Sequence, residues 1–556
     1  MLKPLRVVFG VLLVVLVVGP AFAQTVDTAW VRRYDGPENL ADLSQAIAVD
    51  DSGNVYVTGE SQSGVEQFYQ HDYATIKYLP NGDTAWVRRY NGPGNDLDKA
   101  YAMAVDDDGN VYVSGGSVGS GTSRDYATIK YVSDGDTAWV RRYNGPGDGT
   151  DDVSALAVDG SGNVYVTGKS WGCSGNYDIV TIEYHPDGAA GWEAIYSGTG
   201  SGSDGADAIA VDASGDVCVT GCAVGFGTYQ DYVTIRYGSD GGTWRTYDGP
   251  ADSSDYGHAL AIDGSGNVYV TGNSIGSGTS SDYATIKYLA NGDTAWVRRY
   301  NGPGNGDDGG RAVAVDNSGN VYVTGYSGGS GTGNDWATIK YLANGDTAWV
   351  RRYNGPGNGS DLAAAIAIDG SGNVYVTGAS TGSGTGYDFT TIKYLANGDS
   401  GWVMRYDGPA GGDDASGYLA MDDSGNVYVT GYSEGSGTDY DYCTIKYVQG
   451  VTGVKDETGD RERPSQFDLS QNYPNPFNPA TKIEFTLAKS GFVTLQIYDT
   501  LGRKVRTLVS EELSSGYKSV IWDGKNDDGE DVASGVYFYQ LKVGDFSEPK
   551  KMLLLK

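Results

Sequence analysis

GNVYVTG, at residues 162–168, belongs to a series of near-identical segments that recur along the chain. The copies begin at residues 53, 109, 162, 215, 266, 319, 372 and 425, so successive copies start 51 to 56 residues apart. A period near 50 residues is typical of β-propellers and solenoids. The copy at 215–221 reads GDVCVTG and is the most divergent.

Each period contains four short runs with the composition of β-strands. In the third period they are Ala155–Asp159 (ALAVD), Asn163–Gly168 (NVYVTG), Asp178–Tyr184 (DIVTIEY) and Gly191–Tyr196 (GWEAIY). β-Branched and aromatic residues dominate these runs, while Gly, Asn, Asp and Ser fill the gaps between them. Four strands per repeat is the content of one propeller blade. The repeats therefore predict an all-β, eight-bladed β-propeller over residues 24–447.

The phase of the repeat predicts how the ring closes. The outermost strand type, TAWVRRY, already appears at Thr28–Tyr34, and the last repeat ends at Asp441–Tyr447 without one. We therefore expect the N-terminal strand to complete the eighth blade, which removes an exposed sheet edge. An open β-solenoid is the alternative, because it also needs repeated short strands.

Loop lengths indicate which face of the ring could bind a ligand. The turns Asp369–Asn373 and Leu289–Asp293 are tight hairpins, whereas Tyr300–Asp308 and Ser327–Asp335 are longer connections. In a four-stranded meander the two longer connections share one face, which becomes the candidate binding face. Its Gly, Ser, Asn, Asp and Tyr residues suit polar ligands such as glycans, or cations, although glycines could also serve backbone geometry alone. The candidate residues of this face are Tyr300, Asp308, Asp335, His71 and His258.

The sequence contains few residues in the patterns that a catalytic site needs. His71 and His258 fall in blades that are opposite in a ring of eight, so they should not form one site. The unusual residues scatter along the sequence, and the repeated aspartates such as Asp50, Asp106 and Asp159 favour turn capping over acid–base catalysis. The sequence shows no nucleophile–base set and no phosphate-binding GxxxxGK[ST] motif. We therefore expect a non-enzymatic protein without a cofactor.

The charge composition of the chain limits the classes of partner that it can bind. Lys and Arg number 39 against 71 Asp and Glu, and the formal net charge is −32. Nucleic acid is an improbable partner, because binding phosphates needs basic patches. Four cysteines occur: Cys218 and Cys443 fall in strands as ordinary thiols, whereas Cys173 and Cys222 lie in loops of adjacent repeats and could pair. We expect a monomer.

The N-terminus predicts export. Lys3 and Arg6 precede an apolar stretch from Val7 to Val18, and Ala21-Phe22-Ala23 resembles a cleavage site. A signal peptide over residues 1–23, cut between Ala23 and Gln24, is expected; an uncleaved anchor is the alternative. No other apolar run is long enough to cross a membrane, so we expect no transmembrane segment in the mature chain.

A separate module closes the chain. Residues 448–466 break the repeat with polar and charged residues and are expected to form a linker. Alternating segments such as KIEFTL and VTLQIY predict a small Ig-like β-sandwich over residues 467–556. Asp523, Asp527 and Asp531 alternate with a glycine and could hold calcium, although a polar hairpin explains them as well.

Both parts resemble known families. The AVDxSGNVYVTG run, DYATIKY and WVRRYNGPGN resemble the SBBP beta-propeller repeats of exported bacterial proteins. The C-terminal module resembles the type IX secretion sorting domain, with the Ig-like type of flagellar hook-capping proteins. The second likeness implies that the chain is exported to the surface of a Gram-negative-type bacterium, through the periplasm, by type IX secretion machinery. Its motif residues are Asn472, Tyr473, Pro474, Asn475, Pro476, Phe477, Asn478 and Pro479.

Three functions remain open on this basis. The first is a secreted or cell-surface binding or adhesion scaffold that takes a glycan or protein ligand on its long-loop face. The second is a secreted glycan-acting hydrolase or lyase with a site at the propeller channel mouth. The third is a structural surface component in which the repetition is itself the function.

Overall fold

The computed structural model describes residues 25–63, 70–227, 229–238, 241–450, 455–456, 466–472, 475, 477, 481–522, 524–526, 532–544 and 546–555. The chain divides into two compact units, the first ending at Val448 and the second beginning at Gln449. Regular structure in the described residues is β-strand throughout. No helix long and apolar enough to span a membrane occurs in this part of the chain.

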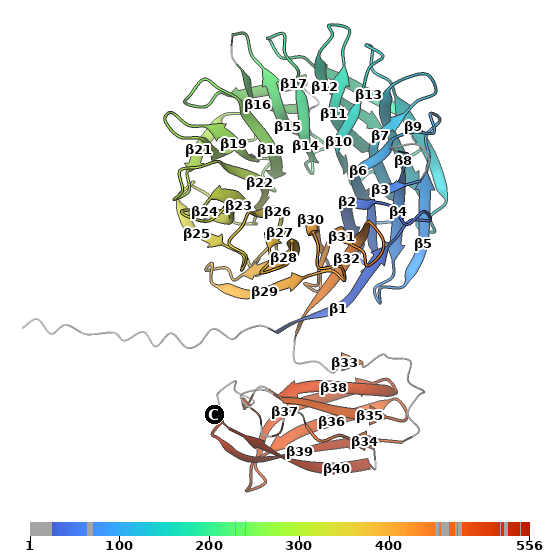
Figure 1. The fold of residues 1–556 in the computed structure, drawn as a ribbon, viewed down its shortest axis with the longest axis vertical. Coiled ribbons are helices and arrows are strands. Elements are labelled where there is room, and N and C mark those ends of the chain that lie inside the picture. The colour runs from blue at the N-terminus through green and yellow to red at the C-terminus, as the bar shows by residue number, and fades with distance from the viewer. Residues whose placement is uncertain are drawn as a thin grey trace, which may run out of the picture. The chain divides into compact units, whose positions relative to one another are not determined.

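The first unit is an eight-bladed propeller of four-stranded sheets (Figure 1), which confirms the predicted fold class. The innermost strands are β2 (Asp42–Val49), β6 (Asp98–Val105), β10 (Asp152–Val158), β14 (Gly205–Val211), β18 (Asp255–Ile262), β22 (Asp308–Val315), β26 (Asp361–Ile368) and β30 (Asp414–Met421). The second strands are β3 (Val55–Gln62), β7 (Val111–Val118), β11 (Val164–Trp171), β15 (Val217–Val224), β19 (Val268–Ile275), β23 (Val321–Gly328), β27 (Val374–Thr381) and β31 (Val427–Glu434).

The third strands are β4 (His71–Tyr78), β8 (Arg124–Tyr131), β12 (Tyr177–Tyr184), β16 (Gln230–Gly238), β20 (Ser281–Tyr288), β24 (Asn334–Tyr341), β28 (Tyr387–Tyr394) and β32 (Tyr440–Gly450). The outermost strands are β5 (Thr84–Tyr90), β9 (Thr137–Tyr143), β13 (Ala190–Tyr196), β17 (Gly241–Tyr247), β21 (Thr294–Tyr300), β25 (Thr347–Tyr353), β29 (Ser400–Tyr406) and β1 (Thr25–Tyr34). Blade 1 is β2–β5, blades 2 to 7 follow in sequence order, and blade 8 is β30, β31, β32 and β1.

The N-terminal strand closes the ring as the repeat phase predicts. β1 lies beside β32 as the fourth strand of blade 8. Arg33 of β1 donates to the backbone oxygen of Ser433 at 2.7 Å and to the Asp441 carboxylate at 2.7 Å. Trp30, 7% exposed, donates its indole N–H to the Pro80 carbonyl of blade 1 at 3.1 Å. One strand therefore joins the last blade to the first.

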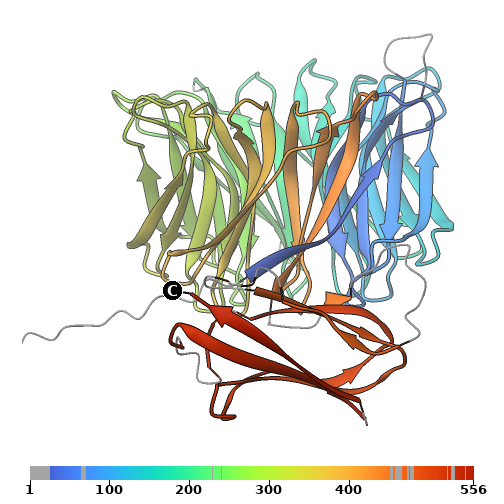
Figure 2. The same ribbon diagram turned by 60° about the horizontal axis from the view of Figure 1, so that its bottom comes forward.

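The blades pack on one another through aromatic and β-branched side chains. A typical interblade core contains Tyr56 and Tyr73 of blade 1 with Val111 and Ile129 of blade 2, all essentially buried. Strands run between two faces of the ring (Figure 2). We call the face with the second-to-third and blade-to-blade connections the long-loop face, and the opposite one the tight-hairpin face.

Aspartates stabilise the tight hairpins, as the sequence predicts. Asp369 Oδ1 accepts from the backbone N–H of Ser371 and Asn373, both at 2.9 Å. Its Oδ2 accepts from the Asn373 amide and the Tyr375 hydroxyl, both at 2.8 Å. Burial alone would raise the pKa of Asp369, but these hydrogen bonds stabilise the carboxylate and hold its pKa below the ordinary value.

The second unit consists of two four-stranded sheets. β33 (Lys455–Asp456), β38 (Gly516–Trp522), β35 (Thr481–Leu487) and β34 (Asp468–Leu469) form one. β37 (Lys504–Leu513), β36 (Gly491–Tyr498), β39 (Gly535–Val543) and β40 (Phe546–Leu554) form the other. Ile483, Phe485, Leu495, Trp522 and Tyr539 lie in their shared hydrophobic core. The predicted Ig-like sandwich is confirmed.

Candidate functional site

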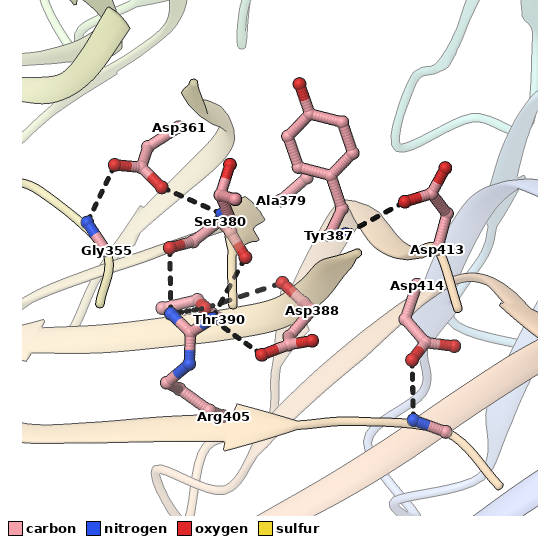
Figure 3. Close-up of polar contacts among 12 residues, drawn as sticks. Gly355, Asp361, Ala379, Ser380, Tyr387, Asp388, Thr390, Arg405, Asp413 and Asp414 are labelled. Atoms are coloured by element: carbon pink, nitrogen blue, oxygen red, sulfur yellow. Dashed lines mark hydrogen bonds and ion pairs between the residues drawn. The ribbon is translucent and has the colours of Figure 1, made fainter. Parts of the chain in front are cut away.

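A polar network ties the strand ends together beneath the long-loop face. In blade 7, Arg405 of β29 donates to the Asp388 carboxylate at 2.6 Å and to the Ser380 carbonyl at 3.0 Å (Figure 3). The same guanidinium reaches Thr390 Oγ1 at 3.1 Å and the Tyr353 hydroxyl of blade 6 at 2.9 Å. A charged group thus links three strands of one blade to the preceding blade.

This network repeats in most of the ring. Six blades carry an arginine with an aspartate partner at these positions: Arg33, Arg89, Arg142, Arg299, Arg352 and Arg405. Blades 3 and 4 have Ile195 and Thr246 there instead. A feature shared by so many equivalent positions is scaffold, since a single binding site would need only one of them.

Each innermost strand is preceded or begun by a buried aspartate that caps the connection before it. In blade 7, Asp361 Oδ2 accepts from the Gly355 N–H at 2.7 Å and Oδ1 from the Thr381 N–H at 3.0 Å. Burial raises the pKa of Asp361 above its ordinary value, against these hydrogen bonds. Burial likewise raises the pKa of the equivalent Asp42 to about 6.

Three of the predicted binding residues belong to this scaffold. Arg352 donates to the Tyr300 hydroxyl at 3.2 Å and to the Asp335 carboxylate at 2.9 Å. Asp308 caps the Gly302 N–H at 2.7 Å. The structure also places Asp335 in β24, paired with Ser327, and not in the predicted loop. The second-to-third connection is therefore shorter than the sequence suggested, because the polar network extends both strands.

The innermost strands share a feature that the sequence did not reveal. The pairing of each innermost strand with its neighbour skips one residue, which marks a β-bulge in every blade. The eight bulged residues are Gln45, Tyr101, Ser154, Asp207, His258, Arg311, Ala364 and Gly417. No two of them are alike. Bulges re-aim side chains and are common beside binding sites.

Three neighbouring positions also vary from blade to blade, although some residues recur in each of them. Two are a cross-strand pair: Leu43, Lys99, Asp152, Gly205, Tyr256, Gly309, Leu362 and Ala415 face Glu60, Gly116, Lys169, Cys222, Asn273, Tyr326, Ala379 and Tyr432, respectively. The third begins the third strand: His71, Arg124, Tyr177, Gln230, Ser281, Asn334, Tyr387 and Tyr440. We call these residues and the bulged residues the variable ring.

The variable ring lies on the long-loop side of the inner strands, which surround the centre of the propeller in Figure 1. Its sequence neighbours hardly change. The glycine before the second-strand position and the aspartate after the third-strand position are the same in all eight blades, as Gly325 and Asp335 exemplify. The unusual residues that scatter along the sequence therefore lie on one face of the ring, where they are spread over all eight blades.

Members of the ring contact one another across blade junctions. Glu60, 3% exposed, accepts from Lys99 Nζ at 2.6 Å and lies 3.0 Å from His71 Nδ1. Against the effect of burial, these two partners hold the pKa of Glu60 below its ordinary value. Arg124 pairs with Asp152 across the next junction at 2.6 Å.

The two predicted ring histidines are held apart in separate contacts. His258 Nδ1 lies 3.0 Å from Asp207, and its Nε2 lies 2.6 Å from Asn273 Oδ1. Neither His258 nor His71 has a hydroxyl or thiol partner among the hydrogen bonds of the described residues. The ring contains seven tyrosines, four lysines and arginines, and three carboxylates. Such a surface can make aromatic, ionic and hydrogen-bonded contacts with a ligand.

Carboxylates that could hold a cation gather elsewhere in the scaffold. In the described residues, ligand atoms of three aspartates lie within 4.8 Å of one another in three groups: Asp35, Asp42 and Asp441; Asp231, Asp248 and Asp255; and Asp388, Asp407 and Asp414. Each group arises where Asp replaces Asn after an outermost strand. Asp441 and Asp388 already pair with Arg33 and Arg405. The predicted calcium residues Asp523, Asp527 and Asp531 lie outside the described residues.

The described residues of the segment from Asn472 to Pro479 make hydrogen bonds within the second unit, two of them to β40 and the residue after it. Asn475 Oδ1 accepts from the Leu553 N–H at 2.9 Å, and Phe477 exchanges two backbone hydrogen bonds with β40 and the residue after it. Asn472, 2% exposed, donates to Thr481 Oγ1 at 2.9 Å. Tyr473, Pro474, Pro476, Asn478 and Pro479 lie outside the described residues, as do Ala23 and Gln24.

Of the four cysteines, only Cys222 belongs to the variable ring, and the structure places it in β15 and not in the predicted loop. All four are unpaired in the structure, including Cys173 and Cys222, whose pairing the sequence left open. Burial raises the pKa of both Cys218 and Cys222 to about 12.

Comparison with solved structures finds proteins of diverse function at low similarity. PorZ, a surface component of the type-IX secretion system of Porphyromonas gingivalis, is 18% identical over 92% of this chain and 70% of its own, with a TM-score of 0.40. The WD40 domain of SCAP from fission yeast is 9% identical over 76% of this chain and 98% of its own, with a TM-score of 0.43. A PL25 ulvan lyase is 11% identical, covering 67% and 95%, with a TM-score of 0.35. Likenesses of this size carry no functional argument.

Family models match parts of the chain. None of the curated proteins matches it. The Beta-propeller repeat model matches residues 30–64, 85–119, 138–175, 243–278 and 295–331. The FlgD Ig-like domain model matches residues 475–545. The chain thus carries SBBP beta-propeller repeats followed by an FlgD Ig-like domain.

Proposed function

We propose that the protein is a secreted or cell-surface, non-enzymatic binding scaffold whose variable ring takes one asymmetric ligand on the long-loop face. The observation that carries this proposal is the bulge position, which holds eight different residues in eight blades of otherwise repeated sequence. A structural role for repetition alone needs identical blades. A ring in which every blade differs suits a ligand that contacts several blades at once.

Exposed aromatic side chains on the same face support this function. Phe226 is 90% exposed and Tyr229 64% exposed in the second-to-third connection of blade 4, where the equivalent residues of blade 5 are Ser277 and Ser280. Exposed aromatic residues on a loop are favourable ligand contacts. A nucleophilic site at the channel mouth would need a hydroxyl or thiol beside a base, and neither ring histidine has such a partner within the described contacts.

A ring variant tests the binding function. Tyr101→Ala, His258→Ala and Arg311→Ala are combined, because blade 7 already has Ala364 at this position. The matched control combines Asp51→Ala, Asn317→Ala and Asp423→Ala in the tight hairpins, where blade 4 has Ala213. The purified proteins are applied to a glycan array and to a displayed random-peptide library.

We expect the unmodified protein to bind members of one library, the ring variant to lose about tenfold in affinity and the control to stay within about twofold. Equal binding by the ring variant, or no binding by the unmodified protein to either library, would overturn the proposal.

The route to the surface is a second part of the proposal. Residues 1–23 act as a signal peptide, and residues 467–556 direct type IX secretion through the motif that begins at Asn472. The motif and the FlgD Ig-like match support this role. A fluorescent reporter flanked by the two segments should reach the surface or medium of a bacterium with type IX secretion. A reporter that stays in the periplasm would contradict it.

A further inference from the structure

Three tyrosines of the variable ring lie at the junction of blades 7 and 8: the rings of two are in contact, and the third, Tyr387, is near enough for its charge to contribute to the raised pKa of Tyr432. The rings of Tyr432 and Tyr440 are 5.0 Å apart between centroids and meet edge to face at 73°. Tyr387 reaches this junction from blade 7, where its backbone N–H donates to Asp413 Oδ1 at 2.9 Å (Figure 3). All three side chains are half-buried, so each presents part of its ring to solvent.

Acidic side chains surround these rings. Partial burial, and then the negative charges of Asp413, Glu434 and Asp439, raise the pKa of Tyr440. Partial burial, Tyr440 and Asp413 raise that of Tyr432. Tyr440 is also the direct cross-strand partner of Glu434. The junction therefore combines aromatic faces with negative potential, the two features that favour an organic cation.

The junction of blades 2 and 3 shows what the same positions do when they carry charge. Lys169, which corresponds to Tyr432, places its ammonium 5.1 Å from the ring centroid of Tyr177, which corresponds to Tyr440. That ammonium lies 3.8 Å from Asp152, and Arg124 lies 2.6 Å from the same carboxylate. At this junction, Lys169 of the protein itself contacts the tyrosine ring, and Lys169 and Arg124 both lie beside the Asp152 carboxylate.

At the junction of blades 7 and 8 the internal cations are replaced. Tyr432 takes the place of Lys169, Tyr387 that of Arg124, and Ala415 that of Asp152. The small alanine opposite Tyr432 fills little of the space that a longer side chain occupies elsewhere. Aromatic rings and carboxylates remain at this junction, but a cation that binds between them has to come from a ligand.

We propose that Tyr387, Tyr432 and Tyr440 form an aromatic site that binds the ammonium group of a lysine side chain on a protein ligand. This inference rests on the proposed binding function and assigns the ligand chemistry of one arc of the ring. The net charge of −32 adds long-range attraction for a basic partner. Tyrosine faces and carboxylates then hold the desolvated ammonium at short range.

The experiment uses the purified full chain without its signal peptide and three labelled forms of one Gly-Gly-Lys-Gly-Gly peptide. One lysine is unmodified, one Nε-trimethylated and one Nε-acetylated. Fluorescence anisotropy should show saturable binding of the two charged peptides and about tenfold weaker binding of the acetylated one, because acetylation removes the charge. Trimethylation keeps the charge but removes the N–H donors, so its binding reports the aromatic contribution.

Sibling blades provide substitutions that the fold already accepts. Tyr432→Ala copies Ala379, Tyr440→Ser copies Ser281 and Tyr387→Asn copies Asn334. Each should weaken binding of the trimethylated peptide about fivefold or more. The matched control is Asp423→Ala in the tight hairpin of blade 8, on the opposite face, which copies Ala213 of blade 4 and should change binding less than about twofold.

Equal affinity for the acetylated peptide, unchanged binding by the Tyr432→Ala and Tyr440→Ser double variant, or no saturable binding of either charged peptide would overturn the inference. Circular dichroism of each variant checks that the fold is retained. If the lysine peptides fail while the ring variant still loses its library ligands, the binding function stands and only this assignment falls.

Discussion

The aspartate at each innermost strand is buried and held at the junction of two blades. Asp42 is fully buried, and its Oδ2 accepts from the Gly36 N–H at 2.5 Å. Asp35 and Asp441 place further negative charge nearby. Burial is the largest of the effects that raise the pKa of Asp42 to about 6. The ionised carboxylate therefore costs stability near neutral pH.

Asp42→Asn should stabilise the propeller at about pH 7.5 by on the order of 2 kcal/mol. The folded pKa, about 6, lies above the unfolded value of 3.8, so the folded state binds more protons in between and the unmodified protein gains stability as pH falls through 6. The advantage of the variant should therefore shrink at about pH 5. Calorimetric unfolding at both pH values measures it.

Asp369→Asn is the matched control of opposite sign. Its folded pKa is lowered by turn hydrogen bonds, so ionised Asp369 stabilises the fold above its unfolded pKa. The substitution should lower the unfolding temperature at about pH 7.5. An equal shift at both pH values for Asp42→Asn would contradict the burial argument.

Individual residues show which contacts can be predicted from the sequence and which cannot. The aspartates of the tight hairpins were assigned to turn capping, because the D-x-S-G-N pattern is local. Asp308, Asp335 and Tyr300 looked like ligand contacts, since they flank glycine-rich connections. Their partner Arg352 lies 17 residues from Asp335 and 52 from Tyr300, a pairing that only the folded sheets reveal.

At the scale of elements, the bulge explains the last glycine of the GNVYVTG repeat. A Cβ on Gly325 would lie 2.0 Å from the Gly309 carbonyl oxygen, and the same close approach recurs at the equivalent glycines of the other blades. The backbone of the bulged strand therefore leaves no room for a side chain at this position of the second strand. The glycine is therefore required by the bulge that presents the variable residue.

Gly325→Ala should destabilise the propeller by about 2 kcal/mol or more, because its methyl group meets backbone and not a movable side chain. Urea unfolding measures the change. The control is Gly306→Ala in the connection before the same blade, where the nearest heavy atom would be 3.7 Å away. It should stay within about 0.5 kcal/mol, and equal effects of the two substitutions would count against the bulge argument.

Strand periodicity predicted the four strands of each blade and the phase of the closing strand, because both follow from repeated local pattern. The bulge was not predictable, since one extra residue does not disturb the composition of AIAVD. The variable ring was missed for the same reason: its four positions are separated in sequence and meet only through the register of two strand pairs.

At the scale of the whole molecule, the ring depends on one strand for its closure. β1 supplies the outer strand of blade 8 and the indole of Trp30 to blade 1. Without it, β32 would present an unpaired edge, which favours association with other chains.

Deletion of residues 25–34 should convert the protein into oligomers and broaden its thermal transition. Size-exclusion chromatography with light scattering, combined with calorimetry, measures both effects. The control is deletion of residues 467–556, which should leave a monodisperse propeller with a sharp transition. A monomeric product with an unchanged midpoint would show that β1 is dispensable.

The closing strand β1 also determines when the propeller can be completed during synthesis. Arg33 and Asp441 are joined although 408 residues separate them, so the first strand to leave the ribosome must wait for the last strand of the propeller, β32. Contacts between residues so far apart in sequence form slowly, because the two ends of a very long segment must first come together. A chain still being synthesised or threaded through a membrane can hold only an open arc of blades. Completion of the ring thus marks the moment when the whole propeller has arrived.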